Sequence, residues 1–136
     1  MIRLASAEAR RLGHNYVGTE HLLVGLVADR DGRAGRVLNG AKLELAKVRS
    51  AIEEVVGRGD AVAEVELRLS RRARRAISFA ATAARRLGHS TVGSEHLLLG
   101  VVNDEGGIGA AIIRSLRVDP GQLEAAIWRD IEGQRS

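Results

Sequence analysis

The segment RRLGHNYVGTEHLLVG, residues 10–25, returns 75 residues later as RRLGHSTVGSEHLLLG, residues 85–100, with 12 of 16 positions identical. Self-similarity at a fixed spacing is the signature of a repeated structural unit, and it defines the unit of folding before any single residue is considered. A unit of about 75 residues is too long for a solenoid repeat and has the size of a small helical bundle. The sequence therefore predicts two fused copies of one bundle, and any binding site is expected twice.

The composition predicts an all-α fold. The chain has 136 residues, of which 45% are hydrophobic, and this is enough for a substantial core. The aromatic residues are Tyr16, Phe79 and Trp128, so the core must be built from Leu, Val, Ile and Ala, as in close-packed helices. No apolar run reaches the roughly 18–20 residues that span a bilayer, and the sequence shows no secretory signal. We therefore expect a cytoplasmic protein without membrane contact.

Capping residues and apolar periodicity predict four helices in each copy. Thr19 and Ser94 follow glycines and precede short apolar runs, so they are expected to be the N-caps of the second helices. Ser70 is expected to cap a long helix over residues 70–87 in the same way. Other helices are expected at residues 2–12, 33–38 and 108–116. The fourth helix of copy one is expected to bury Val48, Ile52 and Val56, and the fourth helix of copy two Leu123, Ile127 and Ile131. The fourth helix of copy two is expected to start at Asp119 and Pro120.

The chain is predicted to form a single domain, residues 1–136, with pseudo-two-fold symmetry. Repeat one covers residues 1–56 and repeat two covers residues 70–136. Residues 57–69 form a linker that contains two glycines and an alternating apolar and charged stretch at 65–69, which suggests an extended connector.

The four histidines fall in matching pairs, His14 with His21 and His89 with His96. A zinc site needs three or four ligands, and the sequence has no cysteine. The histidines are therefore expected to hold the turn between two helices by hydrogen bonds to loop backbone, and no metal is expected. The matching glycines 25 and 100, inside helices, are expected to allow a close approach of neighbouring helices.

The densest basic patch is SRRARR, residues 70–75, and the formal net charge is +4. A basic protein attracts polyanions, so nucleic-acid binding is the alternative function. One patch at the start of a helix is more often a solvated face, which makes nucleic acid the less favoured partner. On this interpretation, charge reversal within residues 71–75 is expected to matter little for ligand binding.

The repeated block RLGH-x-x-VG-[ST]-EHLL-x-G resembles the Clp N-terminal repeat family, which forms the N domains of ClpC- and ClpA-type unfoldases. The resemblance continues through GRAGRVL and VRSAIEEVVGRG after the first block and GIGAAIIRSL after the second. It implies an all-α domain that docks substrates and adaptors for an AAA+ motor attached to a ClpP-type peptidase. The sequence lacks the phosphate-binding motif G-x-x-x-x-G-K-[ST], so docking is expected either in cis to a motor or as a free-standing regulator or decoy.

The resemblance also implies a ligand, because ClpC-type N domains recognise phosphoarginine through the glutamate of the [ST]-EH motif. That role carries over to Glu20 and Glu95, with Thr19 and Ser94 assisting the phosphate. The residues themselves allow this chemistry, since a helix N-terminus attracts phosphate and a carboxylate pairs with a guanidinium. They equally allow a capped helix whose first-turn glutamate only complements the helix dipole.

The expected partners are phosphoarginine-bearing or unfolded proteins, together with Clp adaptor or unfoldase components. The sequence has no nucleophile elbow and no recognisable catalytic motif, so neither enzymatic activity nor a cofactor is expected. In the family, the start of copy one contributes apolar residues to a peptide-binding surface. The residues equivalent to 70–75 are missing from copy one, because Met1 matches Ala76, and the sequence leaves open whether this groove forms.

Overall fold

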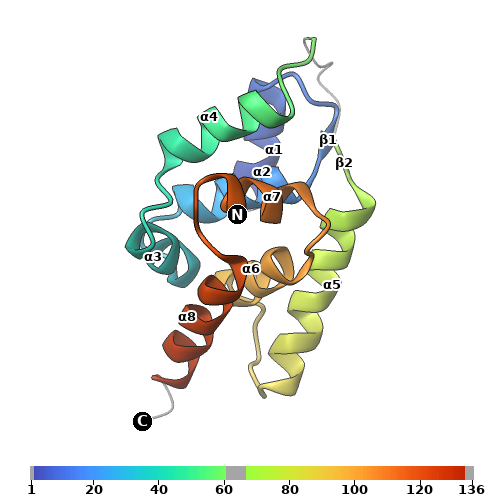
Figure 1. Ribbon diagram of the computed structural model, residues 1–136. Helices are drawn as coiled ribbons and strands as arrows, with labels where there is room; N and C mark the ends of the chain where they lie inside the picture. Colours follow the sequence, from blue (N-terminus) through green and yellow to red (C-terminus); the bar gives the residue numbers. More distant parts are fainter. Residues whose placement is uncertain (1, 61–66, 134–136) are drawn as a thin grey trace.

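The computed structural model describes residues 2–60 and 67–133, which form eight helices and one short pair of strands (Figure 1). Repeat one contains α1 (Ile2–Arg11), α2 (Thr19–Ala28), α3 (Arg33–Gly40) and α4 (Leu45–Val55). Repeat two contains α5 (Arg71–Arg86), α6 (Ser94–Asn103), α7 (Ile108–Ser115) and α8 (Pro120–Glu132). The prediction of two four-helix repeats is confirmed, and Ser70 and Asp119 are the N-caps of α5 and α8 as expected.

The end of the linker is more than a connector, and it adds one element to the predicted all-α fold. Strand β1 (Tyr16–Val17) pairs in parallel with β2 (Arg68–Leu69), and the N–H of Ser70 donates to the carbonyl of Val17 at 2.8 Å. This ladder is short, but it places the start of α5 beside the loop that leads into α2. Residues 65 and 66 of the expected extended stretch lie outside the described residues.

Two central helices form the core. Every residue of α2 from Thr19 to Val27 is buried, and so is every residue of α6 from Glu95 to Val102. Helix α6 lies between α5 and α8, α1 packs on α2, and α2 also packs on α7 of the other repeat (Figure 1). In the part of the chain that the structure describes, no single helix is long and apolar enough to cross a membrane; α6 and α7 would meet the criteria of length and composition only as a pair bent by 86°.

The helices α5 and α6 approach closely at Gly100, as the sequence predicts. The buried face of α5 consists of alanines, and a Cβ atom added at Gly100 would overlap the backbone carbonyl of Ala76. Because this neighbour is backbone, only a shift of a whole helix would relieve the overlap.

We expect Gly100→Ala to lower the free energy of unfolding by about 1–3 kcal/mol, the usual cost of overpacking a core. Gly40→Ala is the matched control, since Gly40 is also helical and an added Cβ would meet no atom within 4 Å. That variant should be neutral or more stable by up to about 1 kcal/mol, because alanine favours helix. Urea denaturation of both variants measures the difference, and equal stabilities would contradict the close packing described above.

Candidate functional site

The N-terminus of each central helix differs by one residue from the prediction. The N-caps are Gly18 and Gly93, whose backbones are extended, while Thr19 and Ser94 are the first helical residues. The two hydroxyl oxygens accept hydrogen bonds from backbone N–H groups of the other repeat. The N–H of Gly109 in α7 donates to Thr19 Oγ1 at 2.9 Å, and the N–H of Ala34 in α3 donates to Ser94 Oγ at 3.1 Å.

These reciprocal bonds explain why the prediction was wrong. The helices α3 and α7 begin at glycine N-caps, Gly32 and Gly107, which have no side chain to accept a hydrogen bond. Thr19 and Ser94 supply the missing acceptor from the opposite repeat, each in the same way. This symmetry of contacts is what a pseudo-two-fold relation between the repeats requires.

The histidines hold the turns before α2 and α6, as predicted. A backbone N–H can only donate, so the N–H of Gly18 fixes His21 Nδ1 as an acceptor at 2.8 Å and leaves the proton on Nε2. His21 Nε2 then donates to His14 Nδ1 at 2.7 Å, and His14 Nε2 donates to the carbonyl of Gly57 at 2.8 Å. This relay ties the start of α2 to the end of α4 and requires both imidazoles to be neutral.

Repeat two contains the first two hydrogen bonds of this relay. The N–H of Gly93 donates to His96 Nδ1 at 2.8 Å, and His96 Nε2 donates to His89 Nδ1 at 2.8 Å. In both copies the histidine at the third helical position takes the part that glutamate or glutamine plays in a capping box. Across the described ranges, no group of three or more His, Cys, Asp or Glu side chains is placed to hold a metal ion.

Burial lowers the pKa of His21 to about 4. Because the unfolded chain has an ordinary histidine pKa near 6.5, it binds a proton between about pH 6.5 and pH 4 that the folded protein does not bind. Unfolding therefore becomes easier as the pH falls through this window, by roughly 3 kcal/mol at its lower end.

His21→Asn tests this linkage, because asparagine retains an acceptor for the Gly18 N–H but does not titrate. We expect the variant to be less stable than the wild type at pH 7 and the difference to shrink steadily toward pH 4.5. Urea denaturation at a series of pH values measures both free energies of unfolding. Parallel curves for the two proteins would rule out His21 as the titrating group.

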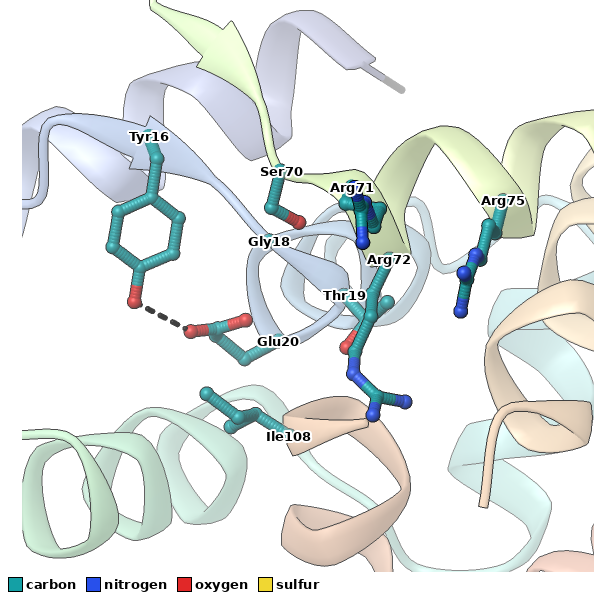
Figure 2. Close-up of a pocket in the computed structure, with 9 residues that line it drawn as sticks. All are labelled: Tyr16, Gly18, Thr19, Glu20, Ser70, Arg71, Arg72, Arg75 and Ile108. Atoms are coloured by element: carbon teal, nitrogen blue, oxygen red, sulfur yellow. Dashed lines mark hydrogen bonds between the residues drawn. The ribbon is translucent and has the colours of Figure 1, made fainter. Parts of the chain in front are cut away.

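Glu20 lies in a cavity of about 490 Å³ at the N-terminus of α2 (Figure 2). Its side chain is buried, with an exposed fraction of 1%, and the Tyr16 hydroxyl donates to Glu20 Oε2 at 3.0 Å. Burial raises the pKa of Glu20, opposed in part by hydrogen bonds from its own backbone N–H and from Tyr16. Burial and the neighbouring Glu20 charge raise the pKa of Tyr16 to about 12, so its hydroxyl stays protonated and remains a donor.

Three arginines of α5 line the same cavity: Arg71, Arg72 and Arg75. Figure 2 shows Tyr16 on one side of Glu20 and the side chains of Arg72 and Arg75 on the other. Arg72 also pairs with Asp104, at 2.5 Å between Nη1 and Oδ1. The basic patch is exposed, as predicted, but it is not a separate solvated face. The expectation that charge reversal within residues 71–75 matters little for ligand binding stays a prediction, and this placement argues against it.

Glu95 lies in a second cavity, of about 520 Å³, at the equivalent position in repeat two. Its carboxylate pairs with Arg33 of α3, at 3.4 Å between Glu95 Oε2 and Arg33 Nη1. Thr19 lines the first cavity beside Glu20, whereas the residues that line the second include Glu95 but not Ser94. Three of the four predicted site residues thus line a cavity: Thr19, Glu20 and Glu95. The role of all four in binding a ligand stays a prediction.

An apolar groove of about 670 Å³ runs between the start of α1 and the helices α5 and α6. Ile2, Leu4 and Val92 line it and are each about half exposed, at 46%, 44% and 54%. Ile77 and Leu97 form part of its wall. The structure thus has an apolar groove beside the start of α1, and peptide binding there stays a prediction.

Sequence reasoning missed several residues of the two cavities. Tyr16 gave a signal, because it is one of the four positions at which the repeated blocks differ, opposite Thr91. Arg33 and Ile108 occupy equivalent positions 75 residues apart, but nothing in the sequence places either beside a glutamate of the other repeat. The arginines of α5 lie beside Glu20 because β2 pairs with β1 and α5 packs against α6 and α2.

Two helical repeats with a cavity at the start of each central helix define a tandem-repeat α-helical domain. The family model for the Clp repeat (R) N-terminal domain matches residues 1–101 and 68–135, and the chain belongs to this family.

Known relatives support the same assignment. The chain is 41% identical over 131 residues to the chloroplastic chaperone protein ClpC2 of Oryza sativa subsp. japonica, a match that covers 96% of this chain and 14% of the relative. It is also 41% identical over 127 residues to the ATP-dependent Clp protease ATP-binding subunit ClpA homolog of Porphyra purpurea, covering 93% of this chain and 16% of that protein. The chain thus spans only a small part of the length of these relatives.

Solved structures share the fold. The N-terminal domain of the chaperone ClpD from Arabidopsis thaliana superposes with a TM-score of 0.79 at 23% identity, covering 96% of this chain and 89% of that one. The Hsp104 N-terminal domain from Candida albicans gives a TM-score of 0.74 at 15% identity, covering 93% and 83%. At these identities the likeness concerns the fold alone.

Proposed function

We propose that this chain is a non-catalytic docking domain of the Clp system that binds phosphoarginine-bearing proteins through the Glu20 cavity. Membership of the Clp repeat family supports the docking role, since relatives carry the names of Clp chaperones and of ATP-binding subunits of Clp protease. The observation that carries the ligand assignment is the placement of one buried carboxylate opposite a cluster of arginines in a single cavity.

Phosphoarginine presents a guanidinium group and a negatively charged phosphoryl group on one side chain. The Glu20 carboxylate faces the guanidinium, and its burial strengthens the attraction because little water screens it. Arg71 and Arg75 face the phosphoryl oxygens, for which guanidinium groups are well-matched donors. The Thr19 hydroxyl accepts from Gly109, and its own proton is left to donate to a phosphoryl oxygen.

The apolar groove suits the second kind of partner, unfolded protein segments or adaptors with exposed apolar side chains. Ile2 and Leu4 on α1 and Val92 in the loop before α6 offer half-exposed aliphatic surface. The docking acts either in cis to a Clp motor or as a free-standing regulator or decoy.

Nucleic acid fits the arginine cluster less well. Arg72 is already paired with Asp104, and Glu20 lies within the same cavity, so a phosphate backbone would meet carboxylates beside the arginines. A small group that carries both charges satisfies both sets of side chains.

We expect Glu20→Gln to weaken the binding of free phosphoarginine at least about tenfold, because it removes the charge that pairs with the guanidinium and keeps the shape of the side chain. The double change Arg71→Gln and Arg75→Gln should cost a similar factor through the phosphoryl group. Isothermal titration calorimetry measures both affinities, and thermal melts confirm folding.

Matched controls lie on the same kinds of helix surface. Glu54→Gln on α4 removes an exposed carboxylate, and the double change Arg85→Gln and Arg86→Gln removes two exposed arginines from the other end of α5. Both controls should bind phosphoarginine like the wild type. If phosphoserine competes as well as phosphoarginine, the proposal is wrong. The nucleic-acid alternative would be favoured if the chain binds a DNA oligonucleotide, if this binding weakens steeply with salt, and if the Arg71 and Arg75 variant loses it.

A further inference from the structure

The two cavities have four equivalent positions, and the residues differ at two of them. Arginines of α5 line only the first cavity. Under the 75-residue shift, Tyr16, Gly18 and Glu20 of the first cavity match Thr91, Gly93 and Glu95 of the second. The third helix of the opposite repeat supplies the fourth position, as the first residue of α7 or α3. That residue is Ile108 in the Glu20 cavity and Arg33 in the Glu95 cavity.

Arg33 places a guanidinium on the Glu95 carboxylate, 3.4 Å from Nη1 to Oε2. This is the same chemical group that phosphoarginine would present to Glu95. The isoleucine at the matching position cannot pair with Glu20, whose carboxylate accepts only a neutral hydroxyl from Tyr16 among its side-chain partners in the described residues.

The neighbouring residue holds Arg33 in place. The N–H of Ala34 donates to Ser94 Oγ at 3.1 Å, and Ser94 directly precedes Glu95. The backbone on both sides of the Arg33 and Glu95 pair is therefore fixed by a hydrogen bond. An internal partner that is held this close competes with a free ligand at high effective concentration and with little loss of entropy.

We propose that Arg33 closes the Glu95 cavity as an internal substitute for the ligand guanidinium, so that this chain has a single open phosphoarginine site, at Glu20. This inference rests on the function proposed above. A pair that is closed nine-tenths of the time weakens the apparent affinity of the Glu95 cavity about tenfold, because only the open fraction binds.

Arg33→Ile tests the proposal by giving the second cavity the residue that the first already has. The change is made in the Glu20→Gln chain, which is titrated at ligand concentrations too low to occupy its weakened first site. We expect Glu20→Gln alone to show no second site in calorimetric titration with free phosphoarginine. Glu20→Gln with Arg33→Ile should bind one equivalent at least about tenfold more tightly, with Glu95 facing the guanidinium and the backbone N–H groups at the start of α6 facing the phosphoryl group. In the chain with Glu20 intact, Arg33→Ile should raise the stoichiometry from one to two.

Arg36→Ile is the matched control, because it removes the same charge from an exposed position three residues further along α3. In the Glu20→Gln chain it should leave binding undetectable. Arg33→Gln serves as a second variant, since it removes the charge while keeping a polar side chain, and thermal melts report on folding.

The outcomes separate the two proposals. Two equivalents of phosphoarginine on the wild type, or one equivalent on Glu20→Gln alone, would overturn the closure by Arg33 and leave the phosphoarginine function standing. Continued silence of the Glu20→Gln chain after either Arg33 change would overturn it too. Failure of the wild type to bind any phosphoarginine would defeat the proposed function and the closure with it.

Discussion

The burial of nearly the whole of α2 and α6 is the constraint on which the rest of the structure depends. A helix N-terminus has backbone N–H groups without partners in the helix, and burial removes the water that would otherwise satisfy them. The buried ends are therefore served by protein atoms: His21 accepts from Gly18, and Thr19 serves the helix of the opposite repeat. Each repeat thus supplies hydrogen-bond acceptors that the other lacks.

The same burial gives the candidate sites their chemistry. A glutamate in the first turn of an exposed helix would be well hydrated, whereas Glu20 has 1% of its surface exposed and its pKa is raised by burial. Such a carboxylate gains more from a cationic partner than a hydrated one does. The cavity in front of Glu20 is lined by arginines of α5, and the short ladder between β1 and β2 holds the start of α5 beside this cavity.

The two repeats have equivalent backbone hydrogen bonds at their central helices but different side chains around the cavities. Both copies have the hydrogen bond between paired histidines, the glycine N-caps and the hydroxyls that accept across the repeat interface. The carboxylates of Glu20 and Glu95 have different partners, because Tyr16 donates a hydrogen bond to Glu20 and Arg33 forms an ion pair with Glu95. The repeats thus preserve the interactions that satisfy buried backbone and vary in the side chains that face the cavities.

The sequence by itself determined the repeat, the helices, the role of the histidines and the positions of Glu20 and Glu95, because each is encoded by local spacing or by a match 75 residues away. It placed the N-caps one residue late, since the hydroxyls of Thr19 and Ser94 serve backbone 90 and 60 residues away. Only the tertiary structure decided which residues face the carboxylates. Ile108, Arg33 and the arginines of α5 reach them across the repeat interface, and no local pattern records such a contact.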